Sequence, residues 1–187
     1  MQGRLGAGLK AVGGAIARAL VGGAVMPRTI HKLQCFGPDG ALKWEEEIEN
    51  LTVNVGLAYM LTTFWKGSNY TAAFYAGLKG SGTIAAADTM ASHAGWSEVT
   101  GYSQTTRPAL TLGSVSGTTT ASLDNSASVA TYGINATVTV AGAFITTDNA
   151  KGGTAGTLIG ASDFATPRSM GSGDTLNLTT TFTNTSG

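Results

Sequence analysis

Apolar and polar residues alternate along several short stretches of the chain, which is typical of β-strands that bury one face. In the last of these stretches, Leu176, Leu178 and Phe182 share one face, and Thr180 interrupts them. Glycine, serine, asparagine and aspartate separate the stretches, as residues of tight turns do. We expect strands at residues 28–36, 41–49, 70–78, 96–102, 107–112, 129–134, 137–146, 156–161 and 175–183.

Two local patterns are more specific. Residues 37–40 read Gly-Pro-Asp-Gly, a strong turn signal that predicts a hairpin between the first two strands. Residues 54–64 change to helical spacing, with Asn54 placed to cap a helix. This is the one convincing helix that the pattern predicts in the body, and its apolar positions are Val55, Leu57, Met60, Leu61 and Phe64.

Many short strands with turns between them favour a sandwich or barrel over alternating strands and helices. We therefore predict an all-β protein, with an antiparallel β-sandwich or jelly-roll-like body and one short helix. The body is expected to cover residues 28–187. Residues 1–27 are expected to form an extended, basic, Gly/Ala-rich N-terminal arm.

Composition adds that the surface is poor in charge. The 187 residues are 42% hydrophobic and only 12% charged, against about 25% in a typical soluble domain. Such a surface is weakly protected against association, which favours a protein partly covered by neighbouring subunits.

The charges are also unevenly distributed, although the formal net charge is zero. No acidic residue precedes Asp39, so the arm is basic and the remainder is net negative. A basic arm on an acidic body often contacts an acidic surface. We expect the arm to become ordered against a neighbouring subunit, and its predicted partner-binding residues are Arg4, Lys10, Arg18 and Arg28. Lys10 and Arg18 interrupt its apolar residues, so we predict neither a signal peptide nor a membrane span.

The search for catalytic motifs gives one candidate. His93 lies near Asp88 and Glu98, an arrangement that can support general-base chemistry. The more common role is a loop histidine beside a core residue, here Trp96. The single Cys35 lies in a predicted strand and is expected to be a buried thiol.

No phosphate-binding loop, dinucleotide motif, zinc spacing or nucleophile elbow occurs, so we predict no enzyme activity, no cofactor and no metal site. The glutamates at 45–47 and 49 are interpreted as protection of a sheet edge. Turn chemistry explains the loop residues Asp124, Asp148, Asp163 and Asp174 better than calcium binding does.

The aromatic residues leave one alternative open. A carbohydrate platform on the body is compatible with the tryptophans and tyrosines, but basic residues are not interleaved with them, which disfavours nucleic-acid binding. The residues concerned are Trp44, Trp65, Trp96, Tyr70, Tyr75 and Tyr102.

Several strings together resemble a group of small virion-associated structural proteins of tailed bacteriophages. The most specific is Asp-Thr-Met-Ala-Ser-His-Ala-Gly-Trp at residues 88–96. The resemblance covers about residues 28–183 and leaves out the arm. The other strings are residues 42–45, 50–57, 74–78 and 173–176, with Tyr102 and Arg107-Pro108.

The resemblance implies a non-enzymatic virion protein, most simply a capsid decoration (cement) protein on the capsid surface. Its expected partners are the major capsid protein, neighbouring copies of itself, or both, with a trimer as the natural homo-oligomer. The alternatives are a tail or neck adaptor, a fibre-anchoring protein, and a receptor- or glycan-binding module of the virion.

Overall fold

The computed structural model describes residues 26–66 and 73–185, with the side chains of residues 28–63 and 73–185. Strands make up 52% of the chain and helices 9%, arranged as two antiparallel sheets. The predicted all-β, sandwich-like fold is therefore confirmed. The elements in order are β1 (Met26–Phe36), β2 (Leu42–Glu49), β3 (Leu51–Thr52), α1 (Asn54–Lys66), β4 (Tyr75–Gly82), β5 (Trp96–Val99), β6 (Thr120–Asp124), the 3₁₀ turn η1 (Ser126–Ser128), β7 (Ala130–Gly133), β8 (Val138–Thr146), β9 (Leu158–Met170) and β10 (Thr175–Thr185).

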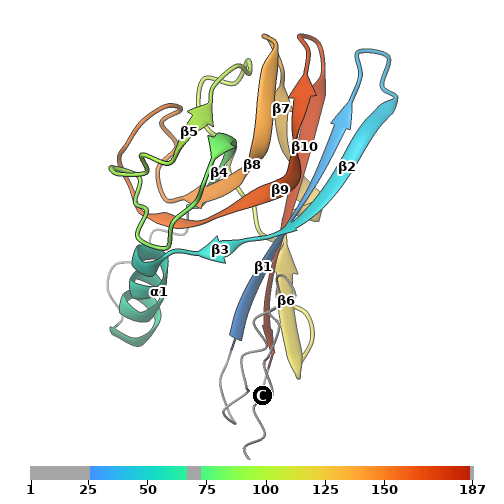
Figure 1. The fold of residues 1–187 in the computed structure, drawn as a ribbon. Helices are drawn as coiled ribbons and strands as arrows, with labels where there is room; N and C mark the ends of the chain where they lie inside the picture. Colours follow the sequence, from blue (N-terminus) through green and yellow to red (C-terminus); the bar gives the residue numbers. More distant parts are fainter. Residues whose placement is uncertain (1–25, 67–72, 186–187) are drawn as a thin grey trace, which may run out of the picture.

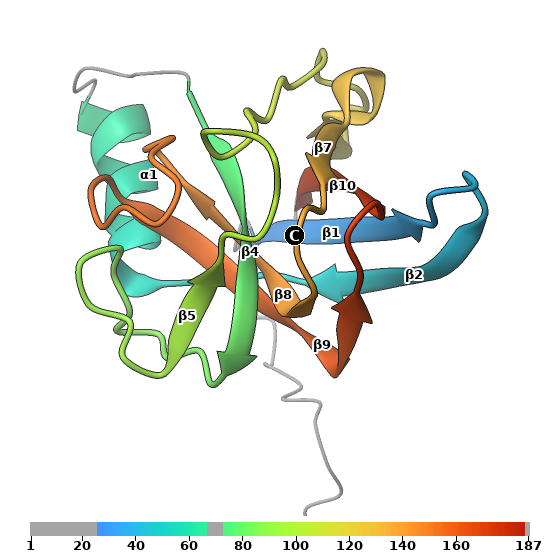
Figure 2. The same cartoon turned by 90° about the horizontal axis from the view of Figure 1, so that it is seen from above.

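The first sheet has the strand order β2-β1-β10-β6, and β7 also pairs with β10. The second sheet has the order β3-β9-β8-β4-β5. In the first sheet, β1 and β10 pair along their whole lengths, from Met26 opposite Thr185 to Phe36 opposite Thr175. The β1–β2 hairpin and α1 lie on opposite sides of the molecule (Figures 1 and 2).

The β1–β2 hairpin forms where the turn signal predicts it. Gly40 has a φ of 76°, in the left-handed region that glycine adopts without strain. The Ala41 N–H donates to Asp39 Oδ1 at 3.0 Å, and the Gly37 N–H donates to the Ala41 carbonyl at 2.8 Å. These contacts close the turn and set the register of the two strands.

One end of the first sheet extends below the body (Figure 1). There the start of β1, the end of β10 and the whole of β6 form a three-stranded extension, with Ile30 paired to Thr181 and Thr181 to Asp124. We call residues 26–30, 120–124 and 181–185 the stalk. The N-terminal end of β1, at Met26, lies at its tip.

The core lies between the two sheets. Leu33, Cys35 and Leu176 of the first sheet and Leu78 and Ile145 of the second are fully buried in one cluster. Tyr132 on β7 joins the two sheets, because its hydroxyl donates to the Ala76 carbonyl on β4 at 2.8 Å. Burial of Cys35 confirms the predicted buried thiol and raises its pKa to about 11.

Helix α1 packs on β9 through a glycine. A Cβ placed on Gly56 would lie 2.1 Å from the Ile159 carbonyl oxygen, so only glycine allows this approach. The predicted helix is confirmed, and it extends to Lys66. Two of its apolar residues nevertheless face solvent, because Leu57 and Leu61 are 44% and 60% exposed.

Several predicted strands differ from the structure. The strand expected at 107–112 is wrong, because only Ala109 bridges to Tyr75. Pro108 has no N–H for a ladder, and the Arg107 side chain turns into the protein. Strand β9 extends to Met170, well beyond the predicted 156–161, with its register broken beside Val140 and Gly142 of β8. β3 and β6 were not predicted, and β5 ends at Val99. Of the strand expected at 70–78, residues 70–72 lie outside the described part of the chain, and β4 begins at Tyr75.

Candidate functional site

His93 does not form a catalytic arrangement with the two carboxylates nearest to it in sequence. Its ring stacks on Trp96 at a centroid distance of 4.1 Å, and its Nδ1 lies 3.0 Å from the Trp96 carbonyl oxygen. Asp88 Oδ2 accepts hydrogen bonds from Trp96 Nε1 and from the Ala85 N–H, each at 2.9 Å. These contacts fit the structural role that we expected for this loop.

Glu98, the other carboxylate near His93 in sequence, pairs with Arg107. The Arg107 side chain is fully buried, and Glu98 accepts from its Nε at 3.0 Å and from its Nη2 at 2.8 Å. The same guanidinium donates to the carbonyls of Asp148 at 2.9 Å and Gly153 at 2.7 Å. Arg107 therefore joins its own segment to β5 and to the loop between β8 and β9, and its role is to hold the loops at this end of the body.

Lys79 is a second buried cation. Its Nζ lies 2.6 Å from Asp163 Oδ1 and donates to the Gly82 carbonyl at 2.6 Å. The lysine is 0% exposed, whereas Asp163 at the broken register of β9 is 39% exposed. Neither buried cation could be recognised from the residue pattern, since lysine and arginine are seldom fully buried.

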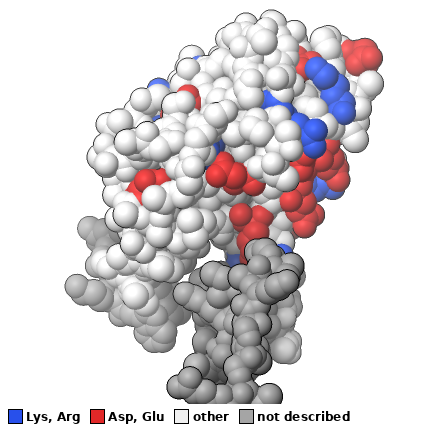
Figure 3. All heavy atoms as spheres, viewed as in Figure 1, with Lys and Arg blue, Asp and Glu red and all other residues white. Residues whose placement is uncertain are grey.

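The glutamates of β2 lie on the edge strand of the first sheet, as predicted. Glu45, Glu47 and Glu49 are exposed, whereas Glu46 is partly buried and pairs with Arg168 on β9. Glu45 accepts from Gln34 and pairs with Lys32 of β1, and these two contacts lower its pKa. On the face shown in Figure 3, charged side chains gather along this hairpin.

Three of the four aspartates expected in loops fit turn chemistry, whereas the expectation was wrong for Asp163, which lies on β9 and pairs with Lys79. Asp124 Oδ1 accepts from the Ser126 N–H at 2.8 Å, and Asp148 Oδ1 accepts from the Ala150 N–H at 2.9 Å. Asp174 Oδ2 accepts from the Gly171 N–H at 2.9 Å and from Lys43 Nζ at 2.6 Å. Among the described residues, no cluster of three or more histidine, cysteine or acidic side chains is arranged to hold a metal ion.

The described tryptophans and tyrosines do not share one exposed surface. Trp96 and Tyr102 are buried, and Tyr102 packs edge-on against Tyr132 at 5.1 Å. Trp44 is half-buried and packs edge-on against Phe164 at 5.8 Å. The Trp65 side chain and Tyr70, two other members of the possible glycan platform, lie outside the described part of the chain.

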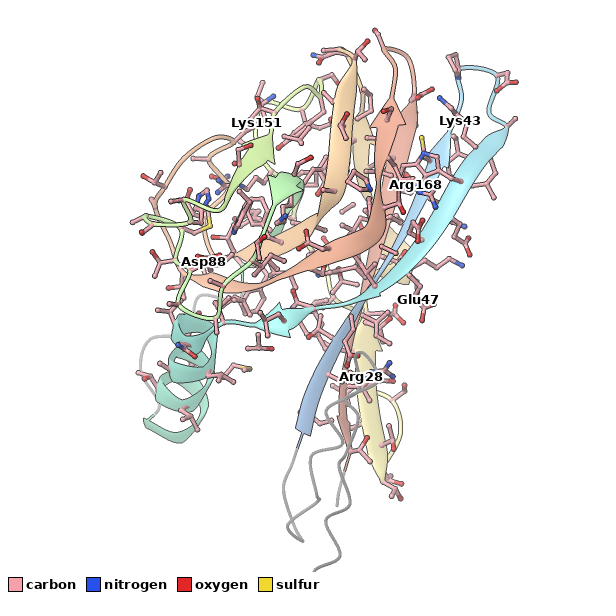
Figure 4. The ribbon with its side chains drawn as sticks, in the orientation of Figure 1. Arg28, Lys43, Glu47, Asp88, Lys151 and Arg168 are labelled. Atoms are coloured by element: carbon pink, nitrogen blue, oxygen red, sulfur yellow. The ribbon has the colours of Figure 1, made fainter. Side chains whose placement is uncertain are left out.

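Of the four predicted partner-binding cations, Arg28 is the one in the described residues; Arg4, Lys10 and Arg18 lie outside them. Arg28 is exposed on the stalk, where its Nε donates to Glu49 Oε1 at 3.1 Å. Figure 4 shows it well separated from Lys43 and Arg168 at the hairpin end of the body. Arg28 therefore marks the stalk as the place where the arm joins the body.

A pocket of about 120 Å³ lies between the stalk and α1. Its apolar side chains are Met60 of α1, Ile159 of β9 and Phe182 of β10, and Arg28, Thr29, Thr52, Thr183 and Asn184 complete it. Leu57 lies three residues before Met60 and four before Leu61, so it adjoins both on the helix surface. We call this pocket with Leu57 and Leu61 the α1 groove.

The surface of α1 carries no charge over its described side chains, which run from Asn54 to Thr63. In Figure 3 the described surface over the helix, at the lower left, is white, whereas the hairpin is strongly charged. Apolar side chains so exposed, next to one another and beside a pocket, are typical of a contact surface. The sequence indicated the helix but not its exposed face, because periodicity does not show which side meets the sheet.

Comparisons with known proteins found no matching family model, no matching curated protein and no matching solved structure. No helix in the described ranges is long and apolar enough to cross a membrane. We take the α1 groove as the candidate functional site, because exposed apolar side chains of α1 lie there beside a pocket.

Proposed function

We propose that this chain is a non-catalytic structural protein of a bacteriophage virion, most simply a capsid decoration protein. The proposal starts from the resemblance of residues 28–183 to small virion-associated proteins. The β-sandwich body supports it as a rigid unit suited to packing against a shell. The contact of His93 with Trp96, and those of Arg107 with Glu98 and the Gly153 carbonyl, support a structural role as well, since they hold loops in place.

The observation that carries the proposal is the exposed apolar face of α1. Leu61 is 60% exposed on a helix whose described side chains include no charge. A face of this kind favours contact with another segment or another subunit over exposure to water. It lies beside the stalk, from which the basic arm departs, so arm and groove together form one contact region.

In this proposal the body sits on the capsid surface, and its partners are the major capsid protein, neighbouring copies of itself, or both. The arm cations Arg4, Lys10 and Arg18, with Arg28 at the root of the arm, contact an acidic surface of a neighbouring subunit. Many weak contacts repeated by symmetry reinforce a shell more strongly than any one of them. A trimer is the oligomer that we expect.

The test is the copy number of the chain in purified particles of the encoding phage, measured by quantitative mass spectrometry against the major capsid protein. For a decoration protein, we expect the copy number of this chain to stand in a simple ratio to the copy number of the major capsid protein. Only a few copies per particle would move the protein to the tail or neck. Complete absence from the particles would overturn the virion proposal.

A further inference from the structure

The α1 groove ends where the N-terminal arm begins. Arg28 lines the groove, and it lies only two residues after Met26, the first described residue of β1. Twenty-five residues precede Met26. An extended link over residues 21–25 spans at most about 20 Å, which brings residue 20 within reach of the helix that forms the opposite side of the pocket.

The arm carries an apolar pattern that matches such a groove. Leu5, Leu9, Val12, Ile16 and Leu20 are spaced by four, three, four and four residues. At 3.6 residues per turn, these five side chains fall within an arc of about 80° on one face of a helix. The sixteen residues from 5 to 20 would make a helix about 24 Å long, comparable to α1 at about 20 Å.

The arm cations lie on the other face of the same helix. Relative to the middle of the apolar stripe, Arg4, Lys10 and Arg18 fall on the opposite half of the helical wheel. The segment is thus amphipathic, with a narrow apolar stripe on one face and basic residues on the opposite face. The apolar counterpart in the α1 groove is Met60, Ile159 and Phe182 with the exposed Leu57 and Leu61. Arg28 lies at the stalk side of the groove, and no acidic or basic side chain lies on the described surface of α1.

We propose that residues 5–20 form an amphipathic helix that packs its apolar stripe into the α1 groove of the same chain. Glycines at positions 6, 8, 13 and 14 make this helix weak by itself, so contact with the groove supplies its stability. The short link at residues 21–25 favours the chain's own groove, since tethering gives the arm a high effective concentration there.

Docking changes what the body presents to a partner. The arm covers Leu57 and Leu61 and displays Arg4, Lys10 and Arg18 outward in fixed positions. In the proposed virion role, the neighbouring subunit then meets a basic helix held on the body. That consequence rests on the proposed function, whereas the docking itself does not and is testable on the isolated protein.

The experiment compares two double variants of the full-length chain by hydrogen exchange with mass spectrometry. Leu9→Ser with Ile16→Ser removes two side chains of the stripe. Ala7→Ser with Ala11→Ser makes the same kind of change on the opposite face and is the matched control. Protection of β8 and β9 reports whether the body remains folded in each variant.

We expect the stripe variant to lose several-fold protection in peptides covering residues 54–63, whereas the control keeps the protection of the unaltered chain. Both should keep full protection in β8 and β9, and neither result should depend on protein concentration. Equal protection in the two variants would overturn the proposal. Protection that disappears on dilution would assign the groove to a second copy's arm instead. Binding of the unaltered chain to anionic lipid vesicles, lost in the stripe variant while α1 protection is unchanged, would assign the stripe to membranes.

Discussion

The Arg107 guanidinium donates two parallel hydrogen bonds to the Glu98 carboxylate, at 3.0 and 2.8 Å, where both side chains are withdrawn from water. Arg107 is 0% exposed and Glu98 is 7% exposed. A bidentate pair of this kind is both directional and strong, but its removal leaves a charge that water cannot reach. The loops around it therefore depend on the pair being complete.

Replacement of Arg107 by methionine should lower the free energy of unfolding by about 3–5 kcal/mol, because Glu98 is left buried without its partner. Chemical denaturation followed by tryptophan fluorescence measures this. Arg28→Met, which removes an exposed ion pair with Glu49, is the matched control and should leave the midpoint within experimental error. If both variants unfold at the midpoint of the unaltered protein, the buried pair does not hold the loops.

The Lys79–Asp163 pair should respond unequally to loss of its two members. Asp163→Asn leaves the fully buried Lys79 charge without its counter-ion and should cost about 3 kcal/mol. Lys79→Met should cost less, because it supplies an apolar chain of similar length and Asp163 is exposed enough to be hydrated. Thermal unfolding of the two variants side by side gives the comparison, and the opposite order would contradict it.

His31 should make the protein sensitive to mild acid. The ring is fully buried on β1, and burial lowers its pKa from 6.5 to about 4. The unfolded chain thus binds a proton at a higher pH than the folded protein does. The contribution of His31 to the free energy of unfolding is therefore fully present above pH 6.5 and is lost as the pH falls toward 4. The total loss is roughly 3 kcal/mol.

The measurement for His31 is the free energy of unfolding at several pH values between 7 and 4.5. His31→Gln removes the titrating group and should flatten the decrease toward acid, although it lowers stability at neutral pH by disturbing the contact with Thr180. An unchanged slope in this variant would show that other groups cause the acid sensitivity.

Gly56→Ala should destabilise the protein, although alanine is the better helix former. The new Cβ would meet the Ile159 carbonyl oxygen, so α1 must move away from β9. Ala58→Gly, on the exposed side of the same helix, should cost about 1 kcal/mol through helix propensity alone. Gly56→Ala should lower the melting temperature and the hydrogen-exchange protection of α1 more than Ala58→Gly does. A Gly56→Ala protein more stable than the unaltered chain would contradict the close contact.

Deletion of residues 1–25 should leave the body folded but weaken its attachment to particles. The core is made by described residues of the two sheets, which the deletion leaves intact. Substitution of Arg4, Lys10 and Arg18 together by alanine should weaken attachment while preserving α1 protection. Occupancy on particles after mixing measures both, and unchanged occupancy of the deletion variant would show that the arm does not contribute.

The fold class and the β1–β2 hairpin could be predicted because each depends on local signals. The turn at 37–40 combines proline with Gly40 at a positive φ, and both features can be recognised in the sequence. The segment 107–112 shows the limit of this reasoning. Its composition favours a strand, but Arg107 binds Glu98 and the loop carbonyls of Asp148 and Gly153, and these partners are brought together only by the fold.

The candidate site was predictable only in part. The basic arm and the helix over 54–64 were both indicated by residue type and spacing. The sequence did not indicate which face of that helix meets the sheet. The helix contacts β9 at Gly56, which has no side chain, and Leu61 remains exposed. The burial of Lys79 was equally hidden, since its counter-ion lies on β9, more than eighty residues further along the chain.

The pairing of β1 with β10 sets how the body responds to mechanical force. Because Met26 lies opposite Thr185 at the tip of the stalk, tension applied between these two points peels the ladder open one residue pair at a time. Tension between Met26 and the far side of the body instead loads the whole β1–β10 ladder in shear, with all of its hydrogen bonds resisting together. A body held at Met26 on one side and at the far end of β10 on the other would experience the second geometry, so it would resist tension along β1 far better than tension that separates Met26 from Thr185.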